Sequence, residues 1–284
     1  MIKYGAHAFV WIGDWNTEDG NAAIHAAADA GAEFIEIPLL NPSGFNVESH
    51  KRELEAAGIF ATASLILPKD AHMPDQPDRA LAFLTEVLEK MDALGSRYLC
   101  GCIGYHLGHL TGVGPTARER AVIEATLATV AERARGFGIN LALEACNRYE
   151  TYLYNTLEDT RDSLLKIAAP NLKLHADTYH MNIEEEGFRA PILATKDVLE
   201  YVHMSESHRG MVGTGTVNWD QVFEALKDAN FSGYLSLESF AAINADIAAA
   251  TCMWRAPKHT GAELAAGGMA FLREHAKKYG LDGA

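Results

Sequence analysis

The sequence predicts an α/β protein built as one (β/α)8 TIM barrel, with residues 1–284 forming a single domain. Three observations favour this fold class. Short runs rich in β-branched and aromatic residues alternate with longer helical patterns. Eight such pairs fill the chain, and no linker, low-complexity tract or compositional break separates them. A chain of 284 residues has the usual length of one such barrel.

The expected strands are short apolar runs, each followed by a helix or a loop. In chain order they are residues 2–10, 32–40, 59–67, 97–102, 139–145, 172–177, 199–205 and 233–239. A doubly wound sheet is the rival architecture, but it would carry a glycine-rich phosphate turn after its first strand. The segment FVWIGDWNTEDG contains no GxGxxG motif, so nucleotide binding loses its main support.

The expected helices lie between these strands, and several end on a glycine, which readily adopts the left-handed conformation of a C-cap. They are residues 17–31, 47–58, 78–95, 116–138 and 261–280. In the third of these segments Leu81, Leu84, Val87 and Leu88 recur at helical spacing, which indicates one buried face. A long loop with three prolines precedes that helix.

Composition limits the partners that the protein can have. Lys and Arg number 24 against 38 Asp and Glu, a net charge of −14, which disfavours nucleic acids and acidic membrane surfaces. The four cysteines show no CxxC pair and no zinc-finger spacing, which predicts buried free thiols in a reducing compartment. We find neither a signal peptide nor an apolar stretch of ~18 residues that would cross a membrane. We therefore expect a cytoplasmic protein that acts on a neutral small molecule.

Four polar residues stand at the ends of the last four predicted strands: Glu144, Asp177, His203 and Glu238. Functional groups of such barrels lie at the C-terminal strand ends, where the βα loops form the open face. An isolated His or Glu there is more often a satisfied polar group than a ligand, but four in phase at consecutive strands indicate a common site. Three converging carboxylates would repel one another unless a cation lay among them.

Oxygen ligands with a single imidazole suit Mn²⁺, Mg²⁺ or Co²⁺ better than structural zinc, which favours cysteine. His175 lies two residues before Asp177 and therefore on the same side of the strand. We expect it to support a ligand or to pack inside the barrel. Four further histidines, His72, His106, His109 and His208, are expected on the surface or in loops.

Glu150, His180 and Arg209 follow the strand ends by a few residues and are expected in loops that bind substrate oxygens. Two simpler interpretations of these three residues remain open. Glu150 and Arg209 would pair with one another, and His180 would be a solvated loop residue.

Four segments, LEACNRYE, HADTYHMNIEE, VHMSESHRG and LSLESF, resemble the signature segments of the ketose 3-epimerases, which include the D-tagatose, D-psicose (allulose) and L-ribulose 3-epimerases. The resemblance extends over the whole chain, including GAHAFVW and MWR. The family is similar in fold to xylose isomerase and endonuclease IV. It implies a homodimer or homotetramer.

The resemblance also implies roles for particular residues. Glu144, Asp177, His203 and Glu238 would hold one Mn²⁺ or a similar ion, and the first and last of them would be the acid and base. The other implied residues bind the sugar: Glu150, His180 and Arg209 at C1 to C3, and His7, Trp15 and Phe240 at the far end.

The expected reaction interconverts free ketoses at C3 (D-tagatose/D-sorbose, D-fructose/D-psicose or L-ribulose/L-xylulose) through a cis-enediolate. An aldose–ketose isomerase, such as a relative of hydroxypyruvate isomerase, would use the same metal ligands and differ only in product. An endonuclease IV-like hydrolase is disfavoured because SESHRG lacks a DxH pair and because the net charge opposes DNA binding. A non-catalytic sugar-binding module would not require so many carboxylates.

Overall fold

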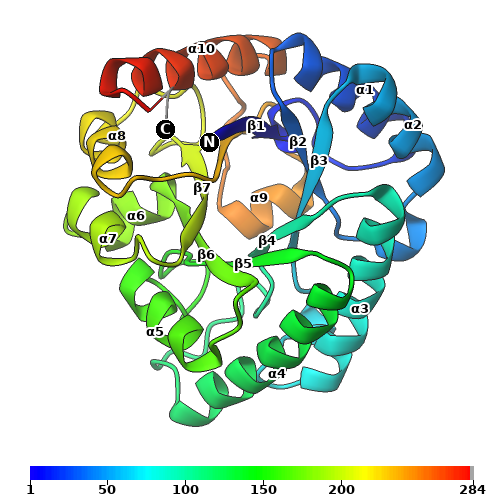
Figure 1. The fold of residues 1–284 in the computed structure, drawn as a ribbon, viewed down its shortest axis with the longest axis vertical. Coiled ribbons are helices and arrows are strands. Elements are labelled where there is room, and N and C mark those ends of the chain that lie inside the picture. Colours follow the sequence, from blue (N-terminus) through cyan, green and yellow to red (C-terminus); the bar gives the residue numbers. More distant parts are fainter. Residues whose placement is uncertain (282–284) are drawn as a thin grey trace.

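Eight parallel strands close into a barrel in the computed structural model, which describes residues 1–281, and their order around the barrel is their order in the chain (Figure 1). The predicted fold class is therefore confirmed. The strands are β1 (Lys3–His7), β2 (Phe34–Pro38), β3 (Phe60–Ile66), β4 (Tyr98–Cys102), β5 (Asn140–Glu144), β6 (Leu172–Asp177), β7 (Leu199–Ser205) and β8 (Tyr234–Glu238).

The helices lie around the outside of the barrel, except for α9, which lies at one of its ends (Figure 1). They are α1 (Thr17–Asp29), α2 (Val47–Ala57), α3 (Pro77–Leu94), α4 (Ala117–Gly136), α5 (Leu157–Ile167), α6 (Thr178–Glu184), α7 (Arg189–Ala194), α8 (Trp219–Asp228), α9 (Ala245–Thr251) and α10 (Gly261–Tyr279). Short 3₁₀ turns, η1 (Ala8–Val10), η2 (Pro42–Gly44) and η3 (Lys69–Ala71), follow the first three strands. Within residues 1–281 no helix has the length and apolarity needed to cross a membrane.

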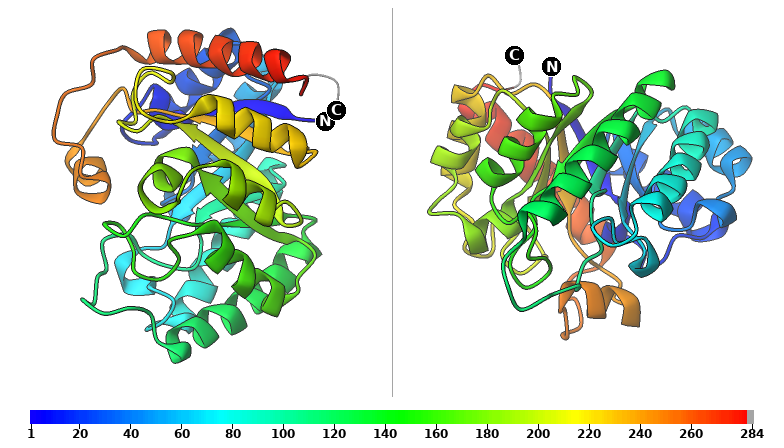
Figure 2. Two further views of the ribbon diagram at one scale, coloured as in Figure 1. Left: turned by 90° about the vertical axis from the view of Figure 1, so that its left-hand side faces the viewer. Right: turned by 90° about the horizontal axis from the view of Figure 1, so that it is seen from below.

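The predicted helix ends are confirmed where glycine provides the cap. Gly58, Gly95 and Gly280 follow α2, α3 and α10 with φ of 69°, 87° and 71°. These positive angles are readily adopted by glycine, which has no Cβ. Short α9 differs from the other helices, because it lies at the end of the barrel opposite the N-terminus (Figure 2).

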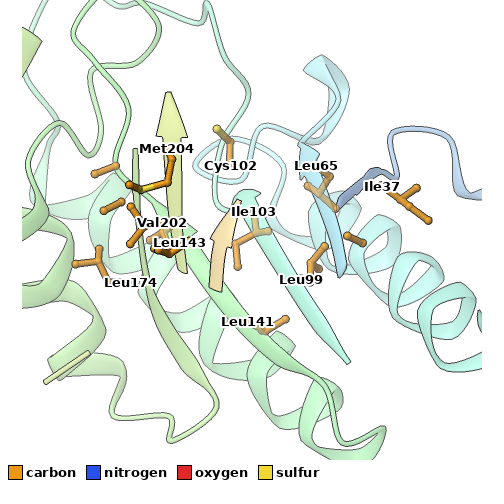
Figure 3. Packing of buried hydrophobic residues seen from close by; sticks show 14 of the residues in the cluster. Ile37, Leu65, Leu99, Cys102, Ile103, Leu141, Leu143, Leu174, Val202 and Met204 are labelled. Atoms are coloured by element: carbon orange, nitrogen blue, oxygen red, sulfur yellow. The ribbon is translucent and has the colours of Figure 1, made fainter. Parts of the chain in front are cut away.

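The main hydrophobic core lies between the strands and the surrounding helices. Outward-facing residues such as Leu141, Leu174 and Val202 pack there (Figure 3). On β8, Leu237 lies so close to α10 that a Cβ added at Gly268 would come within 2.4 Å of it. The strands therefore bury their outer face completely, which is typical of parallel sheets.

The inside of the barrel changes character from one end to the other. Near the strands' N-terminal ends Phe34, Tyr98, Tyr201 and Tyr234 form a separate aromatic cluster, with ring centroids 4.6 Å apart for Tyr98 and Tyr234. This cluster fills the barrel interior at the N-terminal ends of the strands. Because side chains alternate along a strand, the next inward positions on β2, β7 and β8 carry polar residues, Glu36, His203 and Ser236, which belong to the site described below.

Candidate active site

A cavity of about 580 Å³ lies at the C-terminal ends of the strands and extends to α9. The lining residues come from strand ends and βα loops, with Ile247 and Thr251 contributed by α9. All the predicted site residues except Asp177 line it: His7, Trp15, Glu144, Glu150, His180, His203, Arg209, Glu238 and Phe240.

The four predicted strand-end residues do converge. Glu144, Asp177 and Glu238 are the last residues of β5, β6 and β8, but β7 continues two residues beyond His203. The bounds of β7 agree with the predicted residues 199–205, so only the placing of His203 at the strand end was wrong. The register pairs His203 with Asp177, so the two are still neighbours. Glu144, Asp177 and His203 offer ligand atoms within 4.8 Å of one another. Glu238 joins them, with Oε1 3.4 Å from His203 Nδ1.

These groups have the properties of cation ligands. Asp177 Oδ2, His203 Nδ1 and Glu238 Oε2 are buried and have no hydrogen-bond partner among residues 1–281. Burial, with the Glu238 carboxylate, raises the pKa of Asp177 to about 8. Burial, with Cys146, Asp177 and Glu238, also raises the pKa of Glu144 well above its ordinary value. Unpaired buried carboxylates are costly, and a divalent cation is one means of satisfying them all.

Beneath His203 lies Glu36, a completely buried carboxylate on β2 that the sequence analysis missed. Both Glu36 oxygens are 2.9 Å from His203 Nε2, and Oε2 accepts hydrogen bonds from Tyr201 Oη (2.7 Å) and Ser236 Oγ (2.8 Å). Burial alone would raise its pKa, but His203 and His7 hold the pKa of Glu36 well below its ordinary value. The signal was present in the sequence, since one charged residue interrupts the apolar run FIEIP.

The Glu36 contact determines which nitrogen of His203 faces the cavity. An ionised carboxylate can only accept, so Nε2 donates to Glu36 and Nδ1 is directed toward Glu144 Oε1 (3.9 Å) and Glu238 Oε1 (3.4 Å). Burial opposes a charge on the ring, but Glu36 and Glu238 raise the pKa of His203 to about 9. A proton or a cation at Nδ1 would each balance the negative charge of the neighbouring carboxylates. The arrangement is that of a metal-binding imidazole oriented by a carboxylate.

Replacing Glu36 with glutamine should weaken divalent-metal binding about 10- to 100-fold, because such supporting contacts orient the ligand and raise its basicity. A competition titration against a chelating dye measures this affinity. The same substitution at exposed Glu48 on α2 is the matched control. Unchanged affinity in Glu36→Gln would show that the carboxylate does not orient His203.

Glu150, His180 and Arg209 form one cluster beside the four strand-end residues. Arg209 Nη1 is 3.5 Å from Glu150 Oε1, so the expected ion pair of these residues is present. Arg209 Nη2 lies 3.3 Å from His180 Nε2. The guanidinium also stacks on Tyr179, 4.0 Å from the ring centroid. Burial alone would lower the pKa of Arg209, but the nearby carboxylates of Glu150 and Glu238 raise it above its ordinary value.

His180 is not the loop residue that the sequence predicted. It lies in α6, which follows β6 directly, and it is buried. Its Nδ1 accepts from the backbone N–H of Asn147 (3.1 Å), while burial and Arg209 hold its pKa well below the ordinary value. The neutral ring therefore carries its proton on Nε2, which lies 3.6 Å from Glu144 Oε1.

Arg209 is in the connection after β7, as predicted, and this connection is held by Glu206. The Glu206 carboxylate accepts hydrogen bonds from the backbone N–H groups of Ser207, Gly213 and Val217 and from Trp219 Nε1, at 2.8 to 3.2 Å. Arg209 itself adopts a φ of +55°, which is uncommon for a residue with a side chain. The fixed connection therefore holds its guanidinium in the cavity.

The residues expected at the far end of the sugar also border the cavity. His7 Nε2 is 3.1 Å from Ser64 Oγ, Trp15 Nε1 donates to His50 Nε2 at 3.2 Å, and the Phe240 ring is 5.8 Å from that of Phe9.

Other expectations need correction. His72 lies in the loop between η3 and α3, one of the two expected placements, but it is buried there and stacks on His109 with centroids 4.2 Å apart. Cys252 is exposed, whereas the other three cysteines are buried as expected. His175 packs inside the barrel, where its Nδ1 accepts from the Gly101 N–H, in agreement with the packing role.

Comparison with known proteins identifies the family. Residues 24–275 match the family model of the xylose isomerase-like TIM barrel. The chain is 39% identical to the L-ribulose 3-epimerase of Methylomonas sp. (strain DH-1) over 280 residues, which are 96% of this chain and 97% of that protein. It is 36% identical to the ketose 3-epimerase of Arthrobacter globiformis, with 96% of each chain covered.

A solved structure agrees with these sequence matches. The D-allulose 3-epimerase from Methylomonas sp. in complex with D-allulose superimposes with a TM-score of 0.93 at 37% identity, covering 96% of this chain and 97% of that one. The chain therefore belongs to the xylose isomerase-like TIM-barrel family and, within it, to the ketose 3-epimerases, which are isomerases.

Proposed function

We propose that this ketose 3-epimerase is metal-dependent and that Glu144, Asp177, His203 and Glu238 hold one divalent ion. The observation that carries the proposal is the convergence of three buried carboxylates and His203 Nδ1, which lacks a hydrogen-bond partner among residues 1–281. Three oxygen ligands with one imidazole favour Mn²⁺, with Mg²⁺ or Co²⁺ as alternatives. When bound, such an ion acts as a Lewis acid that stabilises the negative charge on the substrate oxygens.

Glu144 and Glu238 act as the two bases in this proposal. They are on β5 and β8, three strands apart in the barrel, and both have an oxygen within 4 Å of His203 Nδ1. Their other neighbours differ, because Glu144 Oε1 lies 3.6 Å from His180 Nε2 and Glu238 Oε2 lies 3.9 Å from Arg209 Nε. One carboxylate removes the C3 proton from one face of the ketose, and the other returns a proton to the opposite face of the cis-enediolate.

Glu150, His180 and Arg209 bind the C1 to C3 end of the open-chain sugar. Arg209 Nε and Nη1 and Glu150 Oε2 are buried without hydrogen-bond partners among residues 1–281, which leaves donors and an acceptor for substrate oxygens. The His180 Nε2–H adds another donor on the same side. His7, Trp15 and Phe240, which border the cavity elsewhere, contact the C4 to C6 end.

The substrates proposed are free ketoses of the D-tagatose/D-sorbose, D-fructose/D-psicose or L-ribulose/L-xylulose type. The activities named for two relatives, an L-ribulose 3-epimerase and a D-allulose 3-epimerase, support this substrate class. The cavity of about 580 Å³ is large enough for a monosaccharide. We also propose a cytoplasmic homodimer or homotetramer that binds neither nucleic acid nor membranes, in keeping with a net charge of −14.

The reaction is tested by incubating the Mn²⁺-loaded protein separately with D-fructose, D-tagatose and L-ribulose and resolving the products by chromatography. A C3-epimerase produces D-psicose, D-sorbose and L-xylulose, respectively. An aldose–ketose isomerase would instead produce aldoses by moving hydrogen between C1 and C2. Aldoses as the main products would overturn the proposal.

Arg209→Ala should lower kcat/KM about 10- to 100-fold while the bound metal stays at the parental level. The loss corresponds to charge-assisted hydrogen bonds of ~1.5–3 kcal/mol, at 1.36 kcal/mol for each factor of ten. Steady-state kinetics and metal analysis of the same sample measure both quantities, and exposed Arg79 provides the matched Arg→Ala control. Loss of the metal would overturn the assignment of Arg209 to substrate binding alone.

A further inference from the structure

Two free thiols border the substrate cavity beside Glu144. Cys102 is the last residue of β4, and Cys146 follows β5 by two residues. Their Sγ atoms are 3.5 Å apart, and Cys102 Sγ lies 3.9 Å from Glu144 Oε2. Both side chains are buried in the protein yet line the cavity, so a small ion that enters the cavity can reach them.

This arrangement has nearly the dimensions of a tetrahedral site for a thiophilic cation. Zinc–sulfur bonds of about 2.3 Å and zinc–oxygen bonds of about 2.0–2.2 Å place two sulfur ligands roughly 3.8 Å apart, and a sulfur and an oxygen roughly 3.6 Å apart. The observed separations of 3.5 Å and 3.9 Å differ from these values by only about 0.3 Å. Small rotations of the side chains therefore suffice to bring these atoms to bonding distance of one ion.

We propose that Cys102, Cys146 and Glu144 form a second cation site, selective for soft ions such as Zn²⁺ and Cd²⁺, on the wall of the substrate cavity. Thiolate ligands select soft ions, whereas carboxylates and one imidazole suit Mn²⁺ and Mg²⁺. The chain therefore carries two sites of different selectivity that share one carboxylate. Binding releases the two thiol protons to solvent and forms two metal–sulfur bonds.

Occupation of this site inactivates the enzyme, a consequence that rests on the proposed role of Glu144. Its two oxygens face different neighbours: Oε1 lies 3.6 Å from His180 Nε2 and 3.9 Å from His203 Nδ1, while Oε2 lies toward Cys102. A cation on the Cys102 side engages Oε2 and deprives Glu144 of its capacity to accept a proton. The soft cation therefore inhibits the enzyme even though Asp177, His203 and Glu238 remain free to hold Mn²⁺.

The binding test uses the full-length Mn²⁺-loaded protein and CdCl₂ as the probe. Cadmium–thiolate bonds absorb in the ultraviolet, so titration should produce a charge-transfer band that saturates at one Cd²⁺ per chain. The band should be strongly reduced in Cys102→Ser and in Cys146→Ser, and it should persist in the control Cys252→Ser, which removes an exposed thiol. An undiminished band in both cavity variants would overturn the site.

A measurement on the unmodified chain keeps the proposal falsifiable if the serine variants fold poorly. X-ray absorption at the zinc edge of the protein with one added Zn²⁺ should show two sulfur ligands at about 2.3 Å. A shell of only nitrogen and oxygen ligands would overturn the proposal.

The inhibition test separates this site from the proposed catalytic role of Glu144. Zn²⁺ at one equivalent should abolish epimerisation by the parent chain, and each serine variant should keep most of its own zinc-free rate. Two sulfur ligands together with an unchanged rate would support the cation site and overturn Glu144 as a proton acceptor. Equal inhibition of the parent and both serine variants would overturn inactivation through the thiol site.

Discussion

Prolonged dialysis of the protein against a chelator is expected to lower the epimerisation rate at least about a hundredfold, and added Mn²⁺ or Co²⁺ should restore it. The Lewis-acid contribution of such an ion is several kcal/mol, and ~2.7 kcal/mol already corresponds to a factor of one hundred. Metal analysis and an epimerisation assay of the same samples measure the effect. Full activity in verified metal-free protein would contradict the proposed ion site.

Thermal unfolding offers an independent measurement of the same site. A ligand that binds only the folded state stabilises it in proportion to RT ln(1 + [L]/Kd), so the melting temperature should increase with Mn²⁺ concentration. A Glu144→Gln, Asp177→Asn double variant should lose this increase, while the exposed pair Glu48→Gln, Asp78→Asn should keep it. An equal increase in both would place the ion elsewhere on the chain.

Metal affinity should also increase as the pH rises from 6 to 8. Burial, with the nearby Glu238 carboxylate, raises the pKa of Asp177 to about 8 in the metal-free protein, so its carboxyl is mostly protonated at pH 6. A cation binds the ionised form, so binding must release that proton, and proton release makes affinity greater at higher pH. Calorimetric titrations at the two pH values in buffers of different ionisation enthalpy measure both the affinity and the protons released.

The sequence was sufficient to predict the barrel because its units are strictly repeated. Each predicted strand overlaps an observed one, since β-branched and aromatic runs bounded by glycine are local signals. The strand-end residues Glu144, Asp177 and Glu238 followed from the same repetition, because parallel strands in a barrel bring their C-terminal ends together. His203 was placed at a strand end by the same argument, although it lies two residues before the end of β7.

Contacts between distant strands were beyond the reach of the sequence. Glu36 reaches His203 across the barrel, from a position 167 residues earlier in the chain, and a single interrupted apolar run does not reveal its partner. The thiol pair of Cys102 and Cys146 likewise depends on β4 and β5 lying side by side, with the two sulfur atoms 44 residues apart in sequence. His180 was assigned to a loop because Asp177 was interpreted only as a ligand, whereas it is also the N-cap of α6, with its side chain accepting from the Tyr179 N–H.

Glu144→Gln and Glu238→Gln are each expected to lower net epimerisation by about 10² to 10⁴-fold, the usual contribution of a positioned acid or base. Glutamine retains an oxygen ligand and nearly the same shape but cannot accept the C3 proton. In D₂O the remaining carboxylate still exchanges the C3 hydrogen of the epimer that it faces. Because the two glutamates approach from β5 and β8, the two variants should exchange opposite epimers, which NMR of the recovered sugars measures.

Both residues are also proposed ligands, so each variant must first be shown to contain the parental amount of metal. The same substitution at exposed Glu132 on α4 controls for the loss of one negative charge. With these controls, the pattern of exchange distinguishes two mechanisms. Two bases on opposite faces leave each variant able to label only one epimer. A single base with a substrate that turns over would leave one variant inactive in exchange and the other able to interconvert both epimers at close to the parental rate, and that result would overturn the two-base mechanism.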